Sequence, residues 1–270
     1  MVQIDTARLR AGLLPPYDRL EVVESTGSTN ADLREAAVAG GVDRTVLIAE
    51  EQTAGVGRRA REWSSPKGAS LSVSVLLRPH GVSFAALGTL AMAAGLAVTD
   101  LAADLGVDAV LKWPNDVLAG SARGKCAGIL AEALAGDDPA VVLGIGLNVR
   151  PLGSGVPAGA GGLPPTSLAE NGARTTDLTE VALALLSALA RREGPWREAG
   201  GNLAAAGLLD TYRARCETLG RRVQVLLPGG DSLVGTAEDV DEAGQLSVRA
   251  DDGVRHNVFA GDVVHLRAAP

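Results

Sequence analysis

Lysine is almost absent from this chain of 270 residues, although 25 residues are lysine or arginine. Only Lys67, Lys112 and Lys125 are lysines, and arginine supplies the remaining strong positive charges. Lysine is a compact charge whose pKa responds to its surroundings, whereas arginine is a planar fork that stays protonated. Because Lys112 and Lys125 lie in two of the densest polar motifs, we interpret them as functional and Lys67 as an ordinary surface charge.

Cysteine is also scarce, since Cys126 and Cys216 are the only two and lie far apart. Their spacing fits neither a metal site nor a disulfide framework, and we assign no residue to a metal site. The absence of a disulfide framework favours the reducing environment of the cytoplasm. The net charge is −7, without long runs of one sign. Because proteins that bind nucleic acid or anionic membranes are usually basic, we expect no nucleic acid partner and no membrane partner.

Long apolar runs are missing as well. No run approaches the ~20 residues that are needed to span a bilayer. The N-terminus has no basic start, apolar centre and small-residue cleavage site, so it resembles neither a signal peptide nor a transit peptide. We therefore expect a cytoplasmic protein. Its length suits one large domain, or a large domain followed by a small one.

The hydrophobic pattern predicts an α+β domain followed by a small all-β unit that begins near Arg221. Predicted strands are Thr45–Glu50, Ser70–Leu77, Val110–Trp113, Cys126–Leu134 and Val141–Val149. Predicted helices are Ser28–Gly41, Phe84–Leu105, Asp177–Arg192 and Leu203–Leu219. Serine alternates with Leu and Val in Ser70–Leu77, the pattern of a half-buried strand. Because strands and helices do not alternate strictly, we expect a largely antiparallel sheet rather than a doubly wound one.

A long polar loop, Glu51–Gly68, separates two predicted strands, and long loops in compact domains are often functional. Its segment EQTAGVGRRAREW combines Gly55 and Gly57 with three arginines, the first of which is Arg58. Open backbone N–H groups and guanidinium groups suit phosphate or carboxylate. The segment is neither a P-loop, because no Gly-Lys-Ser/Thr follows, nor a Rossmann fingerprint. A solvated basic loop is the alternative.

The segment Lys112–Asp116 (KWPND) ends a predicted strand. Pro114 makes the turn rigid, so that Asn115 and Asp116 project from a fixed base. An amide and a carboxylate in this position could orient Mg²⁺ or a ribose. They are also ordinary turn-forming residues, and this alternative stays open.

Three further segments place polar groups at strand or helix ends. Lys125 begins an apolar strand, where it could neutralise a developing phosphate charge or guard a sheet edge, and Gly128 lets a ligand approach the backbone. Asn148 ends the run GIGLNV, and a buried amide needs partners from the backbone or from a ligand. Gly27–Asn30 (GSTN) lies at a helix start, which suits either an anion or small polar head group or plain helix capping.

In their order and spacing, GSTN, EQTAGVGRRAREW, KWPND, KCAGILAE and GIGLNV resemble the catalytic domain of biotin–protein ligases along most of Thr26–Val149. The usual forms in that family are STN, GRGRxGRxW, KWPND, K-x-AGIL-x-E and G-x-G-x-N. The β-rich end of the chain fits the small domain that follows. The resemblance implies a class II aminoacyl-tRNA synthetase-like fold with a mixed sheet over residues 1–216, and an SH3-like β-barrel over residues 217–270.

The resemblance also implies a reaction in two steps. Biotin and ATP, with Mg²⁺ as cofactor, give biotinyl-5′-AMP and pyrophosphate. A lysine on the biotin carboxyl carrier domain of an acyl-CoA or pyruvate carboxylase then attacks the mixed anhydride and releases AMP. The loop Glu51–Gly68 is expected to order over the intermediate and to keep it from water.

Carried over position by position, the resemblance assigns a role to each motif residue. It assigns catalysis to Lys125, Arg58 and Asp116. It assigns biotin binding to Ser28, Thr29, Asn30, Gln52, Gly55, Val56, Gly57, Arg58, Lys125, Gly128 and Leu130. It assigns nucleotide binding to Arg58, Arg61, Trp63, Lys112, Asn115, Lys125 and Asn148.

The chain departs from the family pattern at two positions, since Val56 replaces the usual Arg and Ala60 the usual Gly. Ala60 should disfavour any positive-φ conformation that glycine would accept. These departures leave a catalytically impaired biotin-binding protein as one alternative. A lipoate–protein ligase shares the fold and reaction type, but KWPND with the Gly/Arg loop favours biotin. A DNA-binding repressor is disfavoured, because about 20 residues before the catalytic domain are too few for a helix-turn-helix.

Overall fold

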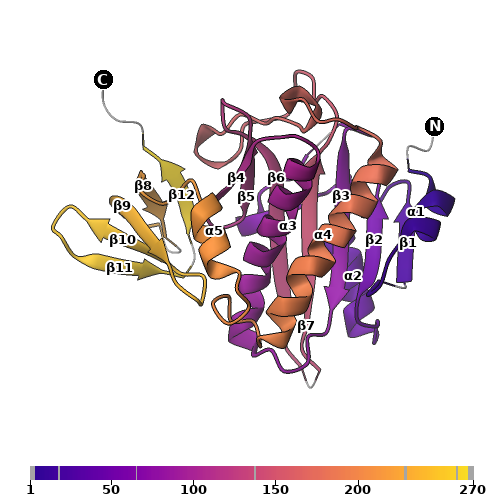
Figure 1. Ribbon diagram of the computed structural model, residues 1–270, viewed down its shortest axis with the longest axis horizontal. Coiled ribbons are helices and arrows are strands. Elements are labelled where there is room, and N and C mark those ends of the chain that lie inside the picture. Colours follow the sequence, from indigo (N-terminus) through magenta and orange to yellow (C-terminus); the bar gives the residue numbers. More distant parts are fainter. Residues whose placement is uncertain are drawn as a thin grey trace.

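Two β-sheets form the framework of the computed structural model, which describes residues 4–17, 19–64, 66–136, 138–227, 230–259 and 261–266 (Figure 1). The larger sheet has seven strands in the order β1-β2-β3-β7-β6-β5-β4. They are β1 (Arg19–Val23), β2 (Thr45–Ala49), β3 (Ser70–Leu77), β4 (Ala109–Lys112), β5 (Asp116–Ala119), β6 (Gly124–Leu134) and β7 (Ala140–Asn148). Strands β1 and β2 are parallel and the other neighbours antiparallel, which confirms the predicted mixed sheet.

Helices cover both faces of this sheet. They are α1 (Thr6–Gly12), α2 (Thr29–Val38), α3 (Leu90–Asp104), α4 (Leu178–Glu198) and α5 (Leu209–Arg215). Helices α3 and α4 lie side by side on one face, and α2 packs on β3 and β7 (Figure 1). Along β2, Val46 and Ile48 join the main core, whereas Leu47 joins a separate cluster with Leu33 of α2. The alternation follows from the period of two in a strand, and it places α2 on the opposite face.

Strand β3 is buried along all eight residues, so the predicted half-buried strand is wrong. Its apolar residues, such as Leu71 and Val73, face the main core. Its serines do not face water, because Ser74 donates to Thr29 Oγ1 or to Asn30 Oδ1, both at 2.7 Å. The alternating serines therefore mark a polar face of β3 that is buried beneath the start of α2. This face is not exposed to solvent.

The predicted helix Phe84–Leu105 consists of a 3₁₀ turn, η2 (Phe84–Thr89), followed by α3. The combined segment Phe84–Asp104 is long and apolar enough to cross a membrane, which corrects the expectation that no run approaches that length. In the structure, 67% of its most apolar window is buried inside the protein. The apolar character is therefore explained by packing between α4 and the sheet.

One predicted helix is shorter than expected, and one strand was not predicted. Only Leu209–Arg215 of the predicted helix Leu203–Leu219 is an α-helix, because turns occupy the residues before it. Strand β5 was not predicted, and its pairing with β4 makes the KWPND segment the turn of a hairpin. The three other 3₁₀ turns are η1 (Arg58–Ala60), η3 (Ala160–Gly162) and η4 (Ala169–Asn171).

The smaller sheet contains five antiparallel strands in the order β11-β10-β9-β8-β12. They are β8 (Arg222–Leu226), β9 (Ser232–Val240), β10 (Leu246–Ala250), β11 (Arg255–Val258) and β12 (Asp262–His265). Within the described residues this order does not close, so the expected barrel is an open sheet whose make-up is consistent with an SH3-like domain. Its apolar residues, including Val223 and Val225, continue the main core.

Candidate functional site

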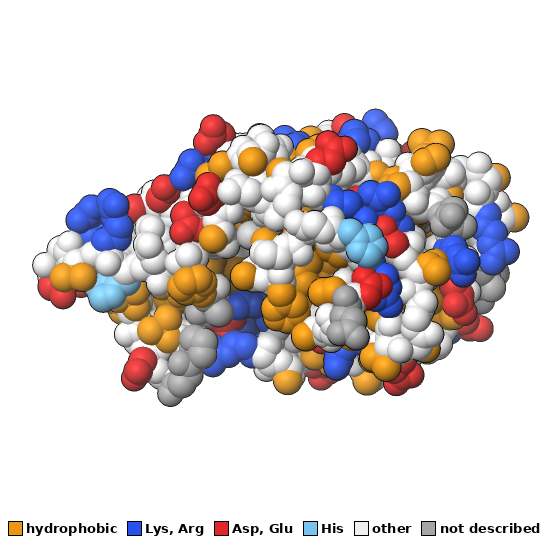
Figure 2. Space-filling view, turned by 90° about the horizontal axis from the view of Figure 1, so that it is seen from below, with side chains coloured by type: hydrophobic (Ala, Val, Ile, Leu, Met, Phe, Trp, Pro, Cys, Tyr) orange, Lys and Arg blue, Asp and Glu red, His pale blue; other side chains and the backbone are white. Residues whose placement is uncertain are grey.

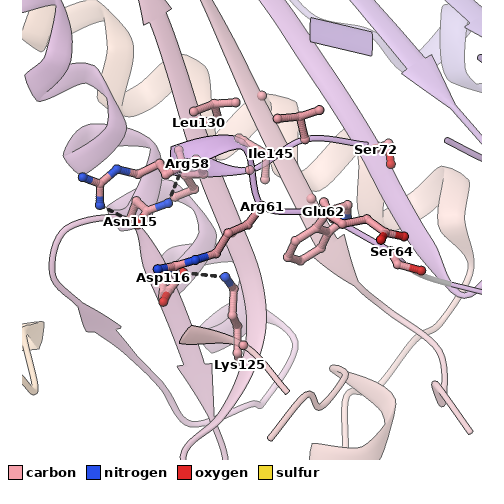
Figure 3. A pocket seen from close by; sticks show the side chains of 18 of the residues that line it. Arg58, Arg61, Glu62, Ser64, Ser72, Asn115, Asp116, Lys125, Leu130 and Ile145 are labelled. Atoms are coloured by element: carbon pink, nitrogen blue, oxygen red, sulfur yellow. Dashed lines mark hydrogen bonds and ion pairs between the residues drawn. The ribbon is translucent and has the colours of Figure 1, made fainter. Parts of the chain in front are cut away.

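A cavity of about 330 Å³ lies where α2, β3, β6, β7, the Gly/Arg loop and the start of β12 meet. Its lining contains every residue that the sequence assigned to the site except Gly55: Ser28, Thr29, Asn30, Gln52, Val56, Gly57, Arg58, Arg61, Trp63, Lys112, Asn115, Asp116, Lys125, Gly128, Leu130 and Asn148. Segments that are distant in the sequence are thus brought together by the order of the strands. Figure 3 shows Lys125 paired with Asp116 at one end of the cavity, and Ser72 and Ser64 away from that pair.

One end of the cavity is a network of neutral hydrogen bonds around Thr29. Gln52 Oε1 accepts from Thr29 N at 2.8 Å and from Thr29 Oγ1 at 3.0 Å. Ser28 caps the helix, since its hydroxyl accepts from Ala31 N. The GSTN segment therefore serves as a helix cap and lines the cavity at the same time.

Asn30 is oriented from two sides at this neutral end. Its Nδ2 donates to Glu132 Oε2 at 2.8 Å, and its Oδ1 faces the hydroxyl of Ser74 at 2.7 Å. A Cβ on Gly144 would lie 2.3 Å from Asn30 Oδ1. The first glycine of GIGLNV is therefore required by the close approach of this side chain, and the last residue of KCAGILAE fixes the direction of its amide.

The middle of the cavity is formed by Trp63 lying against two glycines. A Cβ on Gly146 would come within 2.3 Å of the indole ring, and one on Gly128 within 3.0 Å. The Nε1–H of Trp63 is buried and has no acceptor among the described residues. The flat glycine surface thus seats the aromatic ring, and one N–H is left for a ligand.

The other end of the cavity is charged. Lys125 Nζ lies 2.7 Å from Asp116 Oδ1, and Lys112 Nζ lies 3.7 Å from Asp116 Oδ2. Lys125 Nζ also lies 5.4 Å from the centre of the Trp63 ring. Burial lowers the pKa of Lys112, with Asp116 opposing the effect and Lys125 adding to it. Two lysines share one buried carboxylate, so positive charge is in excess here.

The KWPND turn is held by the smaller sheet as well as by its own hairpin. Trp113 N donates to Thr218 Oγ1 at 3.0 Å, and Trp113 Nε1 donates to Gly244 O at 2.9 Å. Thr218 Oγ1 in turn lies 3.1 Å from His265 Nε2. Burial lowers the pKa of His265 to about 4, with Lys112 adding to the effect. Thr218, just before β8, and Gly244, in the turn between β9 and β10, therefore fix the turn that supplies the charged groups.

The Gly/Arg loop folds into a short hairpin over the cavity. Trp63 N donates to Gly55 O at 2.8 Å, Gly57 N donates to Arg61 O at 2.7 Å, and Val56 pairs with Glu62. A Cβ on Gly55 would lie 2.5 Å from Trp63 O. Gly55 is not among the residues that line the cavity, and its predicted part in biotin binding stays a prediction. A side chain at this position would collide with the opposite arm of the hairpin.

The tip of this hairpin carries the two departures from the family pattern. Val56 has a paired backbone and a side chain that is 49% exposed, so this position contributes mainly backbone to the hairpin. Ala60 has a φ of 55° and Arg59 one of 56°. Two consecutive residues with side chains thus occupy the left-handed region, which costs roughly 1–2 kcal/mol for each of them.

Arg58 points from the loop to the KWPND turn. Its Nη1 lies 3.4 Å from Asn115 Oδ1 and donates to Gly261 O at 3.2 Å, and Asn115 Nδ2 donates to Ile129 O at 2.7 Å (Figure 3). Burial lowers the pKa of Arg58, against the opposing effect of Asp262 and Asp116. Asn115 thus orients Arg58, which lines the cavity beside the two lysines.

Asn148 obtains its partners from the protein. Its Oδ1 accepts from Ser70 Oγ at 3.0 Å, and its Nδ2 donates to Thr166 O at 3.0 Å. The sequence left open whether the partners of Asn148 come from the protein or from a ligand. In the structure, they are a backbone carbonyl and a serine hydroxyl. Asn148 lines the cavity but chiefly connects β7 to the segment that follows η3.

Sequence reasoning missed several lining residues. They are Glu62, Ser64, Ser72, Val73, Pro114, Ile129, Gly144, Ile145, Gly146, Val156, Pro157, Ala158, Gly159, Pro165, Asp262 and Val263. The alternating serines of β3 and the first two glycines of GIGLNV were signals that could have been followed. Asp262 carried no such signal, because its part in the site depends on how the smaller sheet packs against the loop.

A second cavity of about 280 Å³ adjoins the first, and both are lined by Arg58, Asn115 and Leu130. Its remaining lining is mostly apolar and comes from η2, α3, β6, the KWPND turn and the loops of the smaller sheet, including Phe259, which is 78% exposed. Figure 2 shows hydrophobic side chains gathered along a hollow in the middle of the face seen from below. The charged end therefore has an apolar neighbour.

Two family models match the chain. The model of the biotin/lipoate A/B protein ligase family matches residues 21–148, and that of the biotin protein ligase C-terminal domain matches residues 218–266. The biotin–[acetyl-CoA-carboxylase] ligase of Mycobacterium tuberculosis is 47% identical over 257 residues, which cover 93% of this chain and 90% of that protein. The ligase of the same name from Paracoccus denitrificans is 35% identical over 238 residues, 84% of this chain and 93% of that protein.

Solved structures agree with these matches. The biotin protein ligase from Aquifex aeolicus in complex with biotin and ATP matches with a TM-score of 0.73 and 25% identity, covering 93% of this chain and all (100%) of that one. The enzyme from Leishmania major in complex with biotinyl-5-AMP matches with a TM-score of 0.55 and 25% identity, covering 92% of this chain and 100% of that one. Sequence and fold comparisons thus point to one family.

Proposed function

Because this chain belongs to the biotin protein ligase family, we propose that it activates biotin with ATP to give biotinyl-5′-AMP and then transfers biotin to a lysine of a carrier protein. The observation that carries this proposal is that one cavity has both a neutral end and a charged end. The neutral end suits an uncharged ring with polar edges, and the charged end suits a carboxylate beside phosphates.

In the first step, an oxygen of the biotin carboxylate attacks the α-phosphorus of ATP, and the bond to pyrophosphate breaks. Two anions must approach each other, so cations that are already in place lower the barrier. Lys125 and Arg58 supply these cations, and Asp116 and Asn115 hold them in position. Trp63 and the hairpin above it keep water from the mixed anhydride.

In the second step, the neutral amine of a carrier lysine attacks the carbonyl carbon of the intermediate, the bond to AMP breaks, and the proton lost by the amine passes to solvent. Asp116 is paired with Lys125 and Lys112, so its main part in our proposal is to position Lys125 rather than to remove a proton. The second cavity gives the acceptor segment an apolar approach to the charged end. We infer that the acceptor is the biotin-carrying domain of a carboxylase, by analogy with the names of the relatives.

Mg²⁺ is part of the proposal as a companion of ATP. The described residues contain no group of three His, Cys, Asp or Glu that could hold a metal ion. The cavity carboxylates are Glu62, Asp116 and Asp262, and the two aspartates are each paired with a cation. Mg²⁺ that binds through substrate phosphates needs no such site.

The assignment of the chain to two domains is also a proposal. We place the catalytic domain at residues 1–216 and the SH3-like domain at residues 217–270. The cytoplasm is the proposed location, because Cys126 and Cys216 are both free and the carboxylases that carry biotin are its proposed partners.

Biotin-dependent ATP–pyrophosphate exchange tests the function directly. We expect exchange with biotin and none with lipoate, since lipoate has no group that matches the amide and hydroxyl pairs around Thr29. Exchange with lipoate alone would replace the proposed substrate. A folded sample that shows exchange with neither acid, but binds biotin in calorimetry, would establish the catalytically impaired binder instead.

A further inference from the structure

Asp262 is a buried carboxylate that the smaller sheet inserts beside the Gly/Arg loop. It is the first residue of β12, its side chain is 7% exposed, and it lines the cavity. Its Oδ2 accepts from Arg59 Nη1 at 3.0 Å and also from Arg61 Nη2. One carboxylate oxygen of the second sheet thus receives two arginines of the loop.

The neighbours of Asp262 strengthen the same contact. Arg58 Nη1 donates to Gly261 O at 3.2 Å, and Arg59 Nη1 lies 3.5 Å from Leu226 O on β8. Leu226 is the strand partner of Asp262 in the smaller sheet. All three arginines of the loop tip therefore meet the part of that sheet where β8 ends and β12 begins.

The two arginines that share Asp262 have different positions. Arg61 lines the cavity, whereas Arg59 does not. A guanidinium group has five N–H donors, so Arg61 keeps donors for a ligand while one of its nitrogens is held by Asp262. The carboxylate therefore turns Arg61 toward the cavity, and Arg59 anchors the tip from outside.

Charge supports this arrangement. Three guanidinium groups within four residues repel one another, and the loop tip also holds two residues at positive φ, Arg59 and Ala60. Charge repulsion and backbone strain both disfavour this hairpin conformation, so a negative charge beside the tip is needed to stabilise it. Asp262 is the carboxylate that pairs with the tip among the described residues.

We propose that Asp262 is a positioning residue for the nucleotide: the smaller sheet uses it to hold the Gly/Arg loop closed and to aim Arg61 at the phosphates of ATP. The proposal rests on the proposed function for the identity of the ligand. The loop geometry itself does not depend on that function, so the two can fail separately.

The first test is the kinetics of Asp262→Asn, which keeps the size of the side chain and removes its charge. We expect the KM for ATP in biotin-dependent exchange to rise about tenfold, because the variant loses one charge-assisted hydrogen bond. The Kd for biotin, measured without ATP, should stay within about twofold of wild type. Asp262→Glu should recover part of the effect. The control is Asp251→Asn, whose carboxylate pairs with exposed Arg222 on the same sheet.

The second test is limited trypsin digestion of the ligand-free protein. Cleavage after Arg59 and Arg61 should be about tenfold faster in Asp262→Asn than in the wild type, with cleavage after exposed Lys67 as the internal reference. Unchanged cleavage and an unchanged KM for ATP would overturn the proposal, as would an equal loss of biotin and ATP affinity. If wild type shows no exchange at all, the proposed function fails, and digestion alone decides whether Asp262 holds the loop.

Discussion

The two ends of the cavity satisfy their polar groups in different ways. At the neutral end, Thr29, Gln52 and Asn30 are each paired with another protein group, and most partners lie on strands or at a helix start. At the charged end, one carboxylate is shared by two lysines, and another by two arginines of a loop. The polar groups of the neutral end are therefore satisfied within the protein, whereas the charged end holds an excess of positive charge that suits an anion.

The largest effect should come from removing Lys125 from the charged end. Lys125→Ala leaves Asp116 with only the more distant Lys112 and removes the cation nearest to the reacting groups in our proposal. We expect biotin-dependent exchange to fall at least about 100-fold. The variant should still fold, with a lower melting temperature because the buried Asp116 keeps only a weaker partner. The matched control is Lys67→Ala, since Lys67 is a surface lysine that pairs with Glu24. Exchange at the wild-type rate in Lys125→Ala would remove Lys125 from the mechanism.

The neutral end can be broken without changing any charge. In Gly144→Ala, the new Cβ would lie 2.3 Å from Asn30 Oδ1, so the amide must leave the position set by Ser74 and Glu132. Overpacking of this kind costs roughly 1–3 kcal/mol, so calorimetry should show biotin affinity about 10- to 100-fold weaker. Gly27→Ala is the control, because a Cβ there meets nothing within 4 Å.

The comparison of the two ends becomes sharper if the KM for ATP is measured in the same Gly144→Ala protein. The neutral network does not include Lys125 or Arg58, so the KM for ATP should stay within about threefold of the wild-type value. A loss of affinity for ATP as large as the loss for biotin would show that the two ends form one unit.

The third prediction concerns how the free energy of unfolding depends on pH through His265, which lies behind the charged end of the cavity. His265, which contacts Thr218 behind Trp113, has a pKa lowered to about 4. Between that value and the ordinary pKa of histidine, near 6.5, the unfolded chain binds more protons than the folded one, so stability falls as the pH falls through this window. His265 is partly exposed, so we expect a loss of about 1–2 kcal/mol rather than the full shift.

Denaturant unfolding at pH 6.5 and 4.5 measures this effect. His265→Asn should lose less stability than wild type on acidification, because the group that resists protonation is gone. His256→Asn is the control, since His256 is exposed on β11. Equal slopes for wild type and His265→Asn would mean that the acid sensitivity of the fold lies elsewhere.

The sequence located residues at both ends of the cavity, and the exception has a physical reason. Thr29 at the neutral end and Lys125 at the charged end belong to short motifs at helix or strand ends, so a motif was enough to find them. Asp262 lies more than 200 residues from Arg58 and enters the site only because one sheet edge packs on the loop. No local pattern contains that contact.

The fold shows the same limit. Five of the seven strands of the larger sheet were predicted from apolar runs, whereas the partly exposed β1 and the short β5 were not. Strand β3 was judged half-buried because its serines were assumed to face water, whereas they face Thr29 and Asn148 inside the protein. Alternation shows that a strand has two different faces, but it does not show what covers the polar one.

The smallest expected effect tests whether the loop tip is strained. Ala60 has a φ of 55°, so Ala60→Gly should relieve roughly 1 kcal/mol of backbone strain, which the larger entropy of glycine in the unfolded chain largely offsets. The free energy of unfolding should therefore rise by less than about 1 kcal/mol. Ala54→Gly, at an exposed position in the same loop without a positive φ, should lower it by about 0.5–1 kcal/mol. A difference of this sign between the two variants in denaturant unfolding would assign the strain to the tip itself, and equal losses would mean that the tip relaxes in solution.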